Sequence, residues 1–288
     1  MGHAVTVDAV TVDVVSPVTR TPQSLSPSGA STFRQCPRRW KLRYIDKLPD
    51  PPGEPAMRGT FVHRVLEELL AAAPGQRTLD RARSICGDLW PQTALDPDFE
   101  ALELSSDDER SFRWNAWRDV EGYFQLVDPN DVDVVDRERD MRTELGGVPF
   151  RGVVDLVDRT ADGLRVNDYK TGRAPGARFV DSRLTQVWLY AAAIESVGDE
   201  VSEVRLLYLG ETARGRDDRQ PIEISRHFDR AETNSAVAEH RDTWERIGDA
   251  AQTGRFEPKP GPLCSWCPYR AECPEGQVEH QRRHGIAA

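Results

Sequence analysis

Apolar residues recur along this chain at two different spacings, which divides it into predicted helices and strands. The segment from Arg58 to Ala72 has its apolar residues at helical spacing, so it predicts an amphipathic helix. Residues 78–127 predict further helices, with aromatic residues to pack them. Apolar runs at about 131–143, 148–158 and 164–170 predict three strands. Gly146-Gly147 and Asp162-Gly163 separate these runs and are typical of hairpin turns.

The second half of the chain returns to alternating helix and strand. The pattern predicts a helix at about 182–197, strands at about 201–209 and 221–227, and a long helix at about 229–253. The 288 residues fit one moderately large domain, which we place at 23–275, with 78–127 as a helical insertion. Residues 1–22 contain a short repeat, Val5–Asp8 and Val10–Asp13, and are expected to form an edge strand or a tail. Residues 276–288 are expected to form a C-terminal tail.

Lysine is scarce in this chain, yet one lysine lies in a distinctive motif. Lys170 is one of only four lysines among 38 basic residues, and it follows Asp168 at a distance of two in Asp-Tyr-Lys-Thr-Gly. Asp155 ends the apolar run of the preceding strand. Because residues i and i+2 of a strand face the same way, Asp168 and Lys170 should point together, with Asp155 opposite them. Two carboxylates beside a compact cation indicate a phosphodiester-cleaving site; alternating charges on an exposed strand are the alternative.

Two further segments bear on this candidate site. His63 lies at the border of the apolar stripe of the 58–72 helix. It is either a hydrogen-bonded structural residue or a ligand, since imidazole binds manganese and related ions. Gln186 and Tyr190 share a face near the start of the predicted 182–197 helix. They either belong to an ordinary amphipathic helix or help to position the substrate or the lysine.

Four cysteines are candidates for a metal centre. Cys264, Cys267 and Cys273 form a C-x2-C-x5-C pattern at 256–275, and Cys36 lies near the N-terminus. Together they supply four thiolates, the number that a structural zinc or an iron–sulfur cluster needs. Cys86 has no close thiol neighbour in the sequence and is expected to be a small buried residue. A disulfide framework is not expected, since the sequence shows no secretory signal and is long enough to bury its own core.

Charge is distributed unevenly along the chain. The net charge of −10 disfavours binding to nucleic acid, but residues 96–109 hold seven acidic residues and no basic one, so this acidic segment is expected to lie away from a substrate. A basic cluster with interleaved aromatic residues comprises Arg34, Arg38, Arg39, Trp40, Lys41, Arg43 and Tyr44. Because cations follow phosphates and aromatic rings stack on bases, the cluster predicts a contact with single-stranded nucleic acid. A solvated helix face beside Cys36 is the alternative.

The order of these motifs resembles the RecB-like branch of the PD-(D/E)XK nuclease superfamily. The matching motifs are Cys36-Pro37, Gly59…His63, Gly152-Val153-Val154-Asp155, Asp168-Tyr169-Lys170, Gln186…Tyr190 and C-x2-C-x5-C. They run from Leu25 to Pro274 and are most similar to members with an iron–sulfur cluster, such as small CRISPR-associated exonucleases and the nuclease domains of recombination helicases. The chain departs from the pattern in having Asp168 where many relatives have glutamate, and valine rather than proline before Asp155.

The resemblance implies an α/β fold with a restriction-endonuclease-like core, in which helices flank a mixed central sheet. It also implies that His63, Asp155, Asp168 and the Tyr169 carbonyl hold catalytic Mg²⁺ or Mn²⁺, and that Lys170 orients the attacking water. Gln186 and Tyr190 would support the site and contact DNA. Cys36, Cys264, Cys267 and Cys273 would hold a 4Fe–4S cluster that joins the two ends of the chain; from spacing alone, structural Zn²⁺ remains the alternative.

These implications favour a metal-dependent DNA exonuclease that acts on single-stranded DNA or frayed ends in DNA repair or recombination. The alternatives are a non-catalytic nucleic-acid-binding module of the same fold, a nuclease subunit active only with a helicase partner, or a zinc-stapled structural protein. The sequence contains no Gly-Lys dipeptide and so no phosphate-binding loop of that type, which leaves any unwinding to a separate helicase. It also contains no apolar run long enough to span a bilayer, so a cytoplasmic protein without membrane contact is expected.

Overall fold

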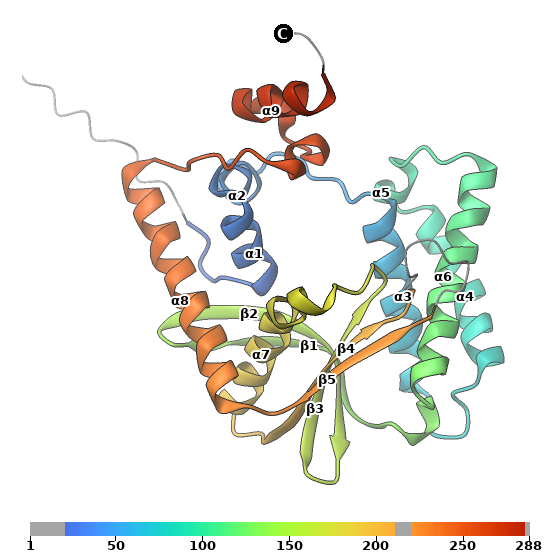
Figure 1. Ribbon diagram of the computed structural model, residues 1–288. Coiled ribbons are helices and arrows are strands. Elements are labelled where there is room, and N and C mark those ends of the chain that lie inside the picture. Colours follow the sequence, from blue (N-terminus) through green and yellow to red (C-terminus); the bar gives the residue numbers. More distant parts are fainter. Residues whose placement is uncertain (1–20, 211–219, 286–288) are drawn as a thin grey trace, which may run out of the picture.

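A computed structural model describes residues 21–210 and 220–285, and its centre is a five-stranded sheet (Figure 1). The strands, in their order across the sheet, are β1 (Asp133–Leu145), β2 (Val148–Thr160), β3 (Gly163–Lys170), β4 (Val201–Tyr208) and β5 (Ile222–His227). Strands β3 and β4 are parallel and the other neighbouring pairs are antiparallel, so the sheet is mixed, as the resemblance implied. The N-terminal repeat at residues 5–13 lies outside the described residues.

The first hairpin follows directly from the sequence pattern. In β2, Phe150, Gly152 and Val154 are buried while the residues between them are exposed, which is the period of a strand with one covered face. Gly146 and Gly147 connect β1 to β2 with φ values of 58° and 83°, a left-handed conformation that glycine adopts without steric cost.

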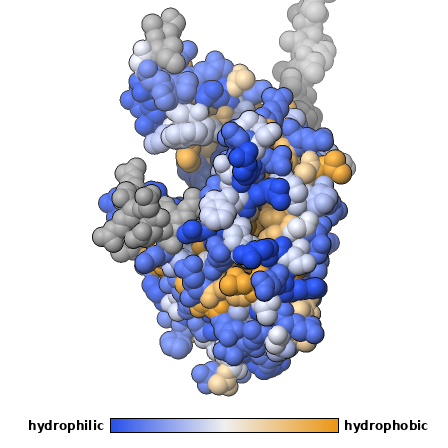
Figure 2. Space-filling model, turned by 90° about the vertical axis from the view of Figure 1, so that its right-hand side faces the viewer, coloured by the Kyte–Doolittle hydropathy of each residue, from blue (hydrophilic) through white to orange (hydrophobic). Residues whose placement is uncertain are grey.

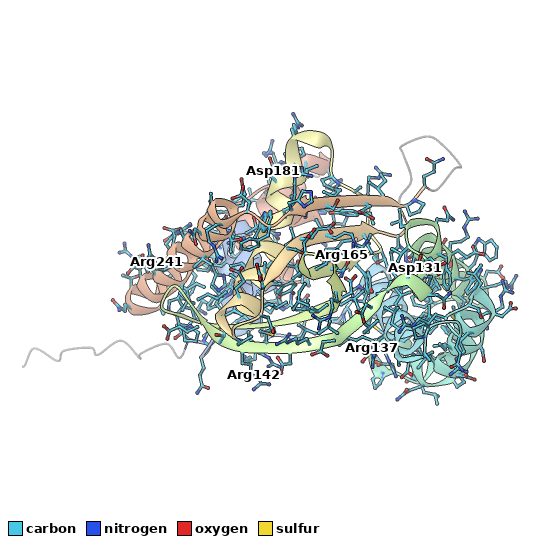
Figure 3. The ribbon with its side chains drawn as sticks, turned by 90° about the horizontal axis from the view of Figure 1, so that it is seen from below. Asp131, Arg137, Arg142, Arg165, Asp181 and Arg241 are labelled. Carbon is cyan, nitrogen blue, oxygen red and sulfur yellow. The ribbon has the colours of Figure 1, made fainter. Side chains whose placement is uncertain are left out.

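Helices cover both faces of the sheet and give it three layers. On one face lie α3 (Glu54–Ala71), α4 (Leu79–Ala94), α5 (Pro97–Glu100) and α6 (Ser106–Leu126), and on the other lie α7 (Val180–Ser196) and α8 (Arg230–Thr253). Strand β4 shows the division: Val204 and Leu206 pack with α7, whereas Leu207 packs with α3 and α6. Seen from below, Arg241 of α8 and Asp131 before β1 mark the two sides of the sheet (Figure 3).

A smaller third core joins the N-terminal and C-terminal parts of the chain. Helices α1 (Pro27–Gln35) and α2 (Pro37–Tyr44) pack against α8 and against Phe256. Ser26 caps α1 by accepting a hydrogen bond from the Gly29 N–H at 3.0 Å. The C-terminal segment then runs over α2 through two short 3₁₀ turns, at Pro262–Trp266 and Arg270–Glu272 (Figure 1).

Two sequence-based boundaries are wrong. Residues 274–284 form helix α9 (Pro274–His284), although residues from 276 onward were expected to form a tail. Pro274 lies in the first turn of α9 and Gly285 ends it at φ 64°, which are ordinary start and stop signals. For the same reason α3 begins at Glu54, beside Pro55, and not at Arg58. Of the helices in the described ranges, none is long and apolar enough to cross a bilayer.

Candidate active site

Asp155 of β2 lies beside Asp168 and Lys170 of β3. The register of the two strands pairs Leu156 with Asn167, which places Asp155 next to Asp168 across the hairpin. The Lys170 Nζ lies 2.5 Å from Asp168 Oδ2, since residues two apart in a strand share a face. The Oδ2 of Asp155 accepts a hydrogen bond from the Tyr169 backbone N–H at 2.6 Å. The predicted carboxylates and ammonium therefore meet at one place.

Helix α7 brings a glutamine to the same place. The Gln186 Nε2 donates to Asp168 Oδ1 at 2.8 Å, and its Oε1 accepts from Lys170 Nζ at 3.3 Å. One turn further along α7, the Tyr190 hydroxyl accepts a hydrogen bond from Gln186 Nε2 at 2.9 Å. The ring of Tyr190 lies against Gly152, where a Cβ would come within 2.7 Å of it. Gln186 thus contacts both Asp168 and Lys170, and Tyr190 holds Gln186 in position.

His63 approaches from the opposite face of the sheet, on α3. Its Nε2 donates to the carbonyl oxygen of Tyr169 at 3.2 Å. Its Nδ1 faces Asp155 Oδ1 at 3.5 Å. The side chain keeps 26% of its surface exposed, so the ring is partly open to solvent.

Glu138 of β1 belongs to this site, although the sequence analysis missed it. Its Oε1 lies 3.8 Å from His63 Nδ1. Its backbone has φ 46°, a conformation that is uncommon for a residue with a side chain and that recurs at functional sites. The charged run Arg137–Asp140 gave no signal of a ligand in the sequence. The β1–β2 register, which pairs Arg137 with Leu156 and Arg139 with Val154, sets Glu138 opposite Asp155.

The site attracts positive charge. Burial lowers the pKa of His63, but hydrogen bonds with Asp155 and Glu138 outweigh it and raise the pKa to about 10. Burial raises the pKa of Asp168 to about 6, against the lowering effect of Lys170. Burial also acts to lower the pKa of Lys170, but Asp168 outweighs it, so that the net pKa lies above the usual value. Lys170 therefore stays an ammonium at neutral pH.

The side chains at the site fit a divalent cation. His63, Glu138 and Asp155 each offer a ligand atom, and these atoms lie within 4.8 Å of one another. No other set of three or more histidine, cysteine or acidic side chains in the described ranges meets that limit. Carboxylate oxygens with one imidazole nitrogen suit Mg²⁺ or Mn²⁺. Asp168, which the resemblance implies as a further ligand, directs Oδ1 at Gln186 and Oδ2 at Lys170.

A buried ion pair supports the end of β3. The Arg58 Nε lies 3.0 Å from Asp119 Oδ2, and the Nη2 of the same guanidinium donates to the Thr171 carbonyl at 3.0 Å. Asp119 is completely buried, and a Cβ on Gly210 would come within 2.0 Å of its Oδ1, so only glycine fits there. The pair ties α3 and α6 to the residue that follows Lys170.

The four cysteines of the motif gather at a second place, between α2 and the C-terminal segment. Cys36, Cys264, Cys267 and Cys273 line one cavity of about 210 Å³. The Sγ of Cys36 accepts the backbone N–H of residue 259, and the Sγ of Cys264 accepts that of residue 261, both at 3.4 Å. Cys86 lies apart on α4, where burial raises its pKa to about 11.

The basic cluster at 34–44 is only partly available to a ligand. Trp40 is 1% exposed and packs among Phe33, Tyr44 and Phe256, so the expectation that its ring stacks on bases is wrong. The remaining cations of the cluster largely have protein partners: Arg34 pairs with Glu239, Arg38 donates to the Phe256 carbonyl, Lys41 pairs with Asp46, and Arg43 pairs with Asp50 and lies over the Tyr44 ring. The alternation of basic and aromatic residues mainly reflects helix packing.

A polar groove of about 600 Å³ runs from the candidate active site between α1 and α7. Its walls include Lys170 and Gln186 at one end. Four arginines also line it: Arg34, Arg39, Arg173 and Arg183. Arg34 and Arg39 come from the predicted basic cluster, whereas the other two flank the β3–α7 connection and were not expected.

The mixed sheet, with a lysine and two carboxylates beside a histidine, defines the class as nuclease-like. Residues 24–274 match the sequence model of the PD-(D/E)XK nuclease superfamily, and the chain belongs to that superfamily. It is similar to the Gene 69 proteins of Mycobacterium phage D29 and Mycobacterium phage L5, each at 27% identity over 86% of this chain and 96% and 95% of those proteins. Among solved structures it is similar to a candidate exonuclease from Eubacterium rectale, at 15% identity and a TM-score of 0.47, over 85% of this chain and 87% of that one.

Proposed function

We propose that this protein is a divalent-metal-dependent DNA exonuclease of the RecB-like branch, acting on single-stranded DNA or frayed ends. The observation that carries the proposal is the meeting of Asp155, Asp168, Lys170 and Gln186 beside His63 in a chain of the nuclease superfamily. Four separate elements, α3, β2, β3 and α7, converge on one point, which a solvated strand face would not require.

The side chains divide the chemistry between them. His63, Asp155 and Glu138 are the residues to hold Mg²⁺ or Mn²⁺, and Asp168 and the Tyr169 carbonyl are the further ligands that the resemblance implies. When bound, such an ion polarises a phosphate and lowers the pKa of a water molecule.

Lys170 carries the second part of the mechanism. As an ammonium it stabilises the negative charge that develops on the phosphate and orients the attacking water. Gln186 fixes Lys170 and Asp168 relative to each other through its two hydrogen bonds, and Tyr190 fixes Gln186. The phosphodiester is then hydrolysed in line, without a covalent enzyme intermediate.

The polar groove is the proposed path of the DNA strand. It leads to Lys170 and Gln186, and its arginines supply positive charge in a protein whose net charge is −10. A groove lined by arginines follows a phosphate backbone without reading its sequence. Because a positively charged groove of this kind binds a single strand along its backbone, single-stranded DNA or frayed ends are the proposed substrate.

The cysteine-lined cavity is the proposed site of a 4Fe–4S cluster. Four thiols from both ends of the chain face one cavity, which is the donor set that such a cluster requires. Structural Zn²⁺, which four thiolates also hold, is the alternative. The role of the cluster is that of a structural staple.

End digestion of this kind serves DNA repair or recombination in the cytoplasm. The chain has no Gly-Lys dipeptide, so a separate helicase would open duplex DNA for it. A nuclease subunit that works only with such a helicase is the nearest alternative, and a non-catalytic DNA-binding module of the same fold is the next.

Degradation of end-labelled single-stranded DNA tests the proposal. Wild-type protein and Lys170→Ala are compared with Mn²⁺, Mg²⁺ or EDTA, on a linear strand and on a closed circular strand of the same sequence. Shortening of the linear strand by wild type alone, dependent on the metal, with the circle left intact, is the expected result.

Other outcomes separate the alternatives. Cleavage of the circle would overturn the exonuclease assignment and leave a metal-dependent nuclease. Activity that persists in Lys170→Ala would remove Lys170 from the mechanism. If wild-type protein that contains its metal cluster cleaves no DNA, either alone or with a helicase that opens a duplex, both nuclease alternatives are excluded and a non-catalytic DNA-binding module remains.

A further inference from the structure

A second groove lies on the outer side of the helical insertion, between α4 and α6. It encloses about 440 Å³, with Phe61 of α3 at its base. We call it the Arg–Trp groove after the residues that dominate its walls: Arg83, Trp90, Arg110, Arg113, Trp114 and Trp117. Figure 2 faces this side of the molecule and shows strongly hydrophilic side chains interleaved with pale and hydrophobic ones.

Arginines and tryptophans are paired throughout the groove. The guanidinium of Arg83 lies 4.6 Å from the centroid of the Trp117 ring, and that of Arg113 lies 4.8 Å from Trp90. Arg118 lies 6.0 Å from the centroid of Trp114. These contacts hold the rings and the charges in fixed relative positions.

The groove is positively charged, in contrast to the molecule as a whole. Its lining contains three arginines and no acidic residue, while the chain has a net charge of −10. Within the described ranges, Arg113 has no carboxylate partner. Arg83 pairs with Asp80 at 3.9 Å and Arg110 with Asp107 at 2.7 Å, but all four side chains are more than 60% exposed, so a phosphate can displace these weak pairs.

The Arg–Trp groove is separate from the candidate active site. Phe61 and His63 are two residues apart on α3 and therefore face in different directions. The polar groove that reaches Lys170 shares none of its lining residues with the Arg–Trp groove. Nothing in the proposed hydrolysis uses the second groove.

Trp114 is the most exposed aromatic residue of α6. It is 59% exposed, whereas Phe112 and Tyr123 are fully buried and Trp117 and Phe124 are half-buried. An exposed tryptophan beside solvent-exposed arginines contributes little to folding. It does offer a flat surface for a nucleobase with cations for the adjoining phosphates.

We infer that the Arg–Trp groove binds single-stranded nucleic acid, with bases stacked on Trp114 and phosphates held by Arg83, Arg110 and Arg113. A single strand is required because paired bases in a duplex hide the faces that would stack. The inference extends the proposed function, since it adds a place where the strand is bound and not cut.

The test is binding to full-length protein in EDTA, where no metal-dependent cleavage occurs. The ligand is a labelled oligothymidylate of about twenty nucleotides, longer than a typical single-strand site, and binding is followed by its anisotropy and by tryptophan quenching. Trp114→Ala and the double variant Arg83→Ala/Arg113→Ala are compared with Trp266→Ala. Trp266 is 78% exposed and lies on the C-terminal segment, so it is a matched control.

Trp114→Ala should weaken binding about tenfold and reduce the quenching, because one stacked base is lost. In the double arginine variant, the slope of the logarithm of the binding constant against the logarithm of the salt concentration should be smaller by about two, which corresponds to two fewer released counterions. Hydrolysis of a trinucleotide, too short to reach the groove, should be unchanged in both, and Trp266→Ala should bind like wild type.

Wild-type affinity and quenching in Trp114→Ala would overturn the inference. If an abasic strand bound as tightly as oligothymidylate, base stacking would be excluded. If oligoglutamate displaced the labelled strand but excess unlabelled oligothymidylate did not, the groove would be assigned to an acidic protein partner instead. If wild-type protein cuts no DNA, and Trp114→Ala binds oligothymidylate more weakly than wild type does, the proposed function fails and this inference stands.

Discussion

Gln186 donates its side-chain N–H to Asp168 at 2.8 Å, across the gap between α7 and β3. Asp168 is 1% exposed, so this hydrogen bond replaces one that water would otherwise supply. The Oε1 of the same amide accepts a hydrogen bond from Lys170 at 3.3 Å, so Gln186 contacts both the carboxylate and the ammonium. A helix that follows the strand thereby fixes the relative position of the two groups.

Replacing Gln186 by leucine should separate these two groups without unfolding the protein. We expect kcat to fall about 10–100-fold, as for other residues that orient a metal site, with a smaller change in KM. Steady-state hydrolysis of single-stranded DNA with Mn²⁺ measures both. Gln92→Leu, at an exposed position of α4, is the control and should keep wild-type kinetics. A KM effect alone would make Gln186 a DNA contact rather than a positioning residue.

Glu138→Gln should weaken binding of the divalent cation. The substitution keeps the shape of the side chain but removes one negative charge from the group formed with His63 and Asp155. We expect the Mn²⁺ concentration for half-maximal activity to rise by roughly tenfold, with a similar loss in Mn²⁺ affinity by calorimetry without DNA.

Glu144→Gln is the matched control for this variant. Glu144 lies on the same strand as Glu138 but is exposed, so its substitution should leave Mn²⁺ affinity unchanged. Equal affinity in the Glu138 and Glu144 variants would exclude Glu138 from the metal site.

The sequence predicted the strand-borne part of the site because strand geometry is simple. Asp168 and Lys170 had to face the same way, and hairpin pairing brought Asp155 to them. The Gln186–Tyr190 pair was visible for a similar reason, since a spacing of four places both on one helix face. These are local rules with a fixed period.

The features that the sequence missed depend on departures from such rules or on long-range packing. Glu138 lies opposite Asp155 in the β1–β2 register and has φ 46°, and neither feature is visible in the charged run that contains it. Trp40 alternates with arginines as a base-stacking residue would, but α8 and Phe256 bury it, and those contacts are remote in sequence. Helix α9 carried ordinary signals in Pro274 and Gly285, which its strongly polar composition obscured.

Acid should destabilise this protein through His240. His240 on α8 is completely buried, and its burial, followed by the nearby charge of Arg34, lowers its pKa to about 4 from 6.5. The native state therefore keeps the neutral ring while the unfolded chain takes up a proton below about pH 6.5. The contribution of His240 to the unfolding free energy should therefore fall by up to about 3 kcal/mol as the pH drops from about 6.5 to 4. Protonation of Asp168, whose pKa is raised to about 6, acts in the opposite direction over part of this range.

Urea unfolding at pH 7 and pH 5 measures this dependence. His240→Leu should flatten the fall in unfolding free energy between the two values, whatever its effect at pH 7. His227→Gln, at an exposed position of β5, should retain the wild-type slope. An unchanged slope in His240→Leu would place the acid sensitivity elsewhere.

Cys264→Ala and Cys86→Ala separate a proposed cluster ligand from a half-buried thiol. Cys264 faces the cavity shared with Cys36, Cys267 and Cys273, whereas Cys86 lies alone on α4. Loss of one thiolate from four should remove the brown colour and visible absorption of an iron–sulfur cluster. It should also lower the melting temperature, because binding of the cluster contributes to folding. Cys86→Ala should keep the colour and unfold at a temperature close to that of wild type.

Two outcomes would contradict the cluster assignment. A colourless wild-type protein with one equivalent of bound zinc would show that the four cysteines hold Zn²⁺. A Cys264→Ala protein indistinguishable from wild type would show that they hold no metal centre.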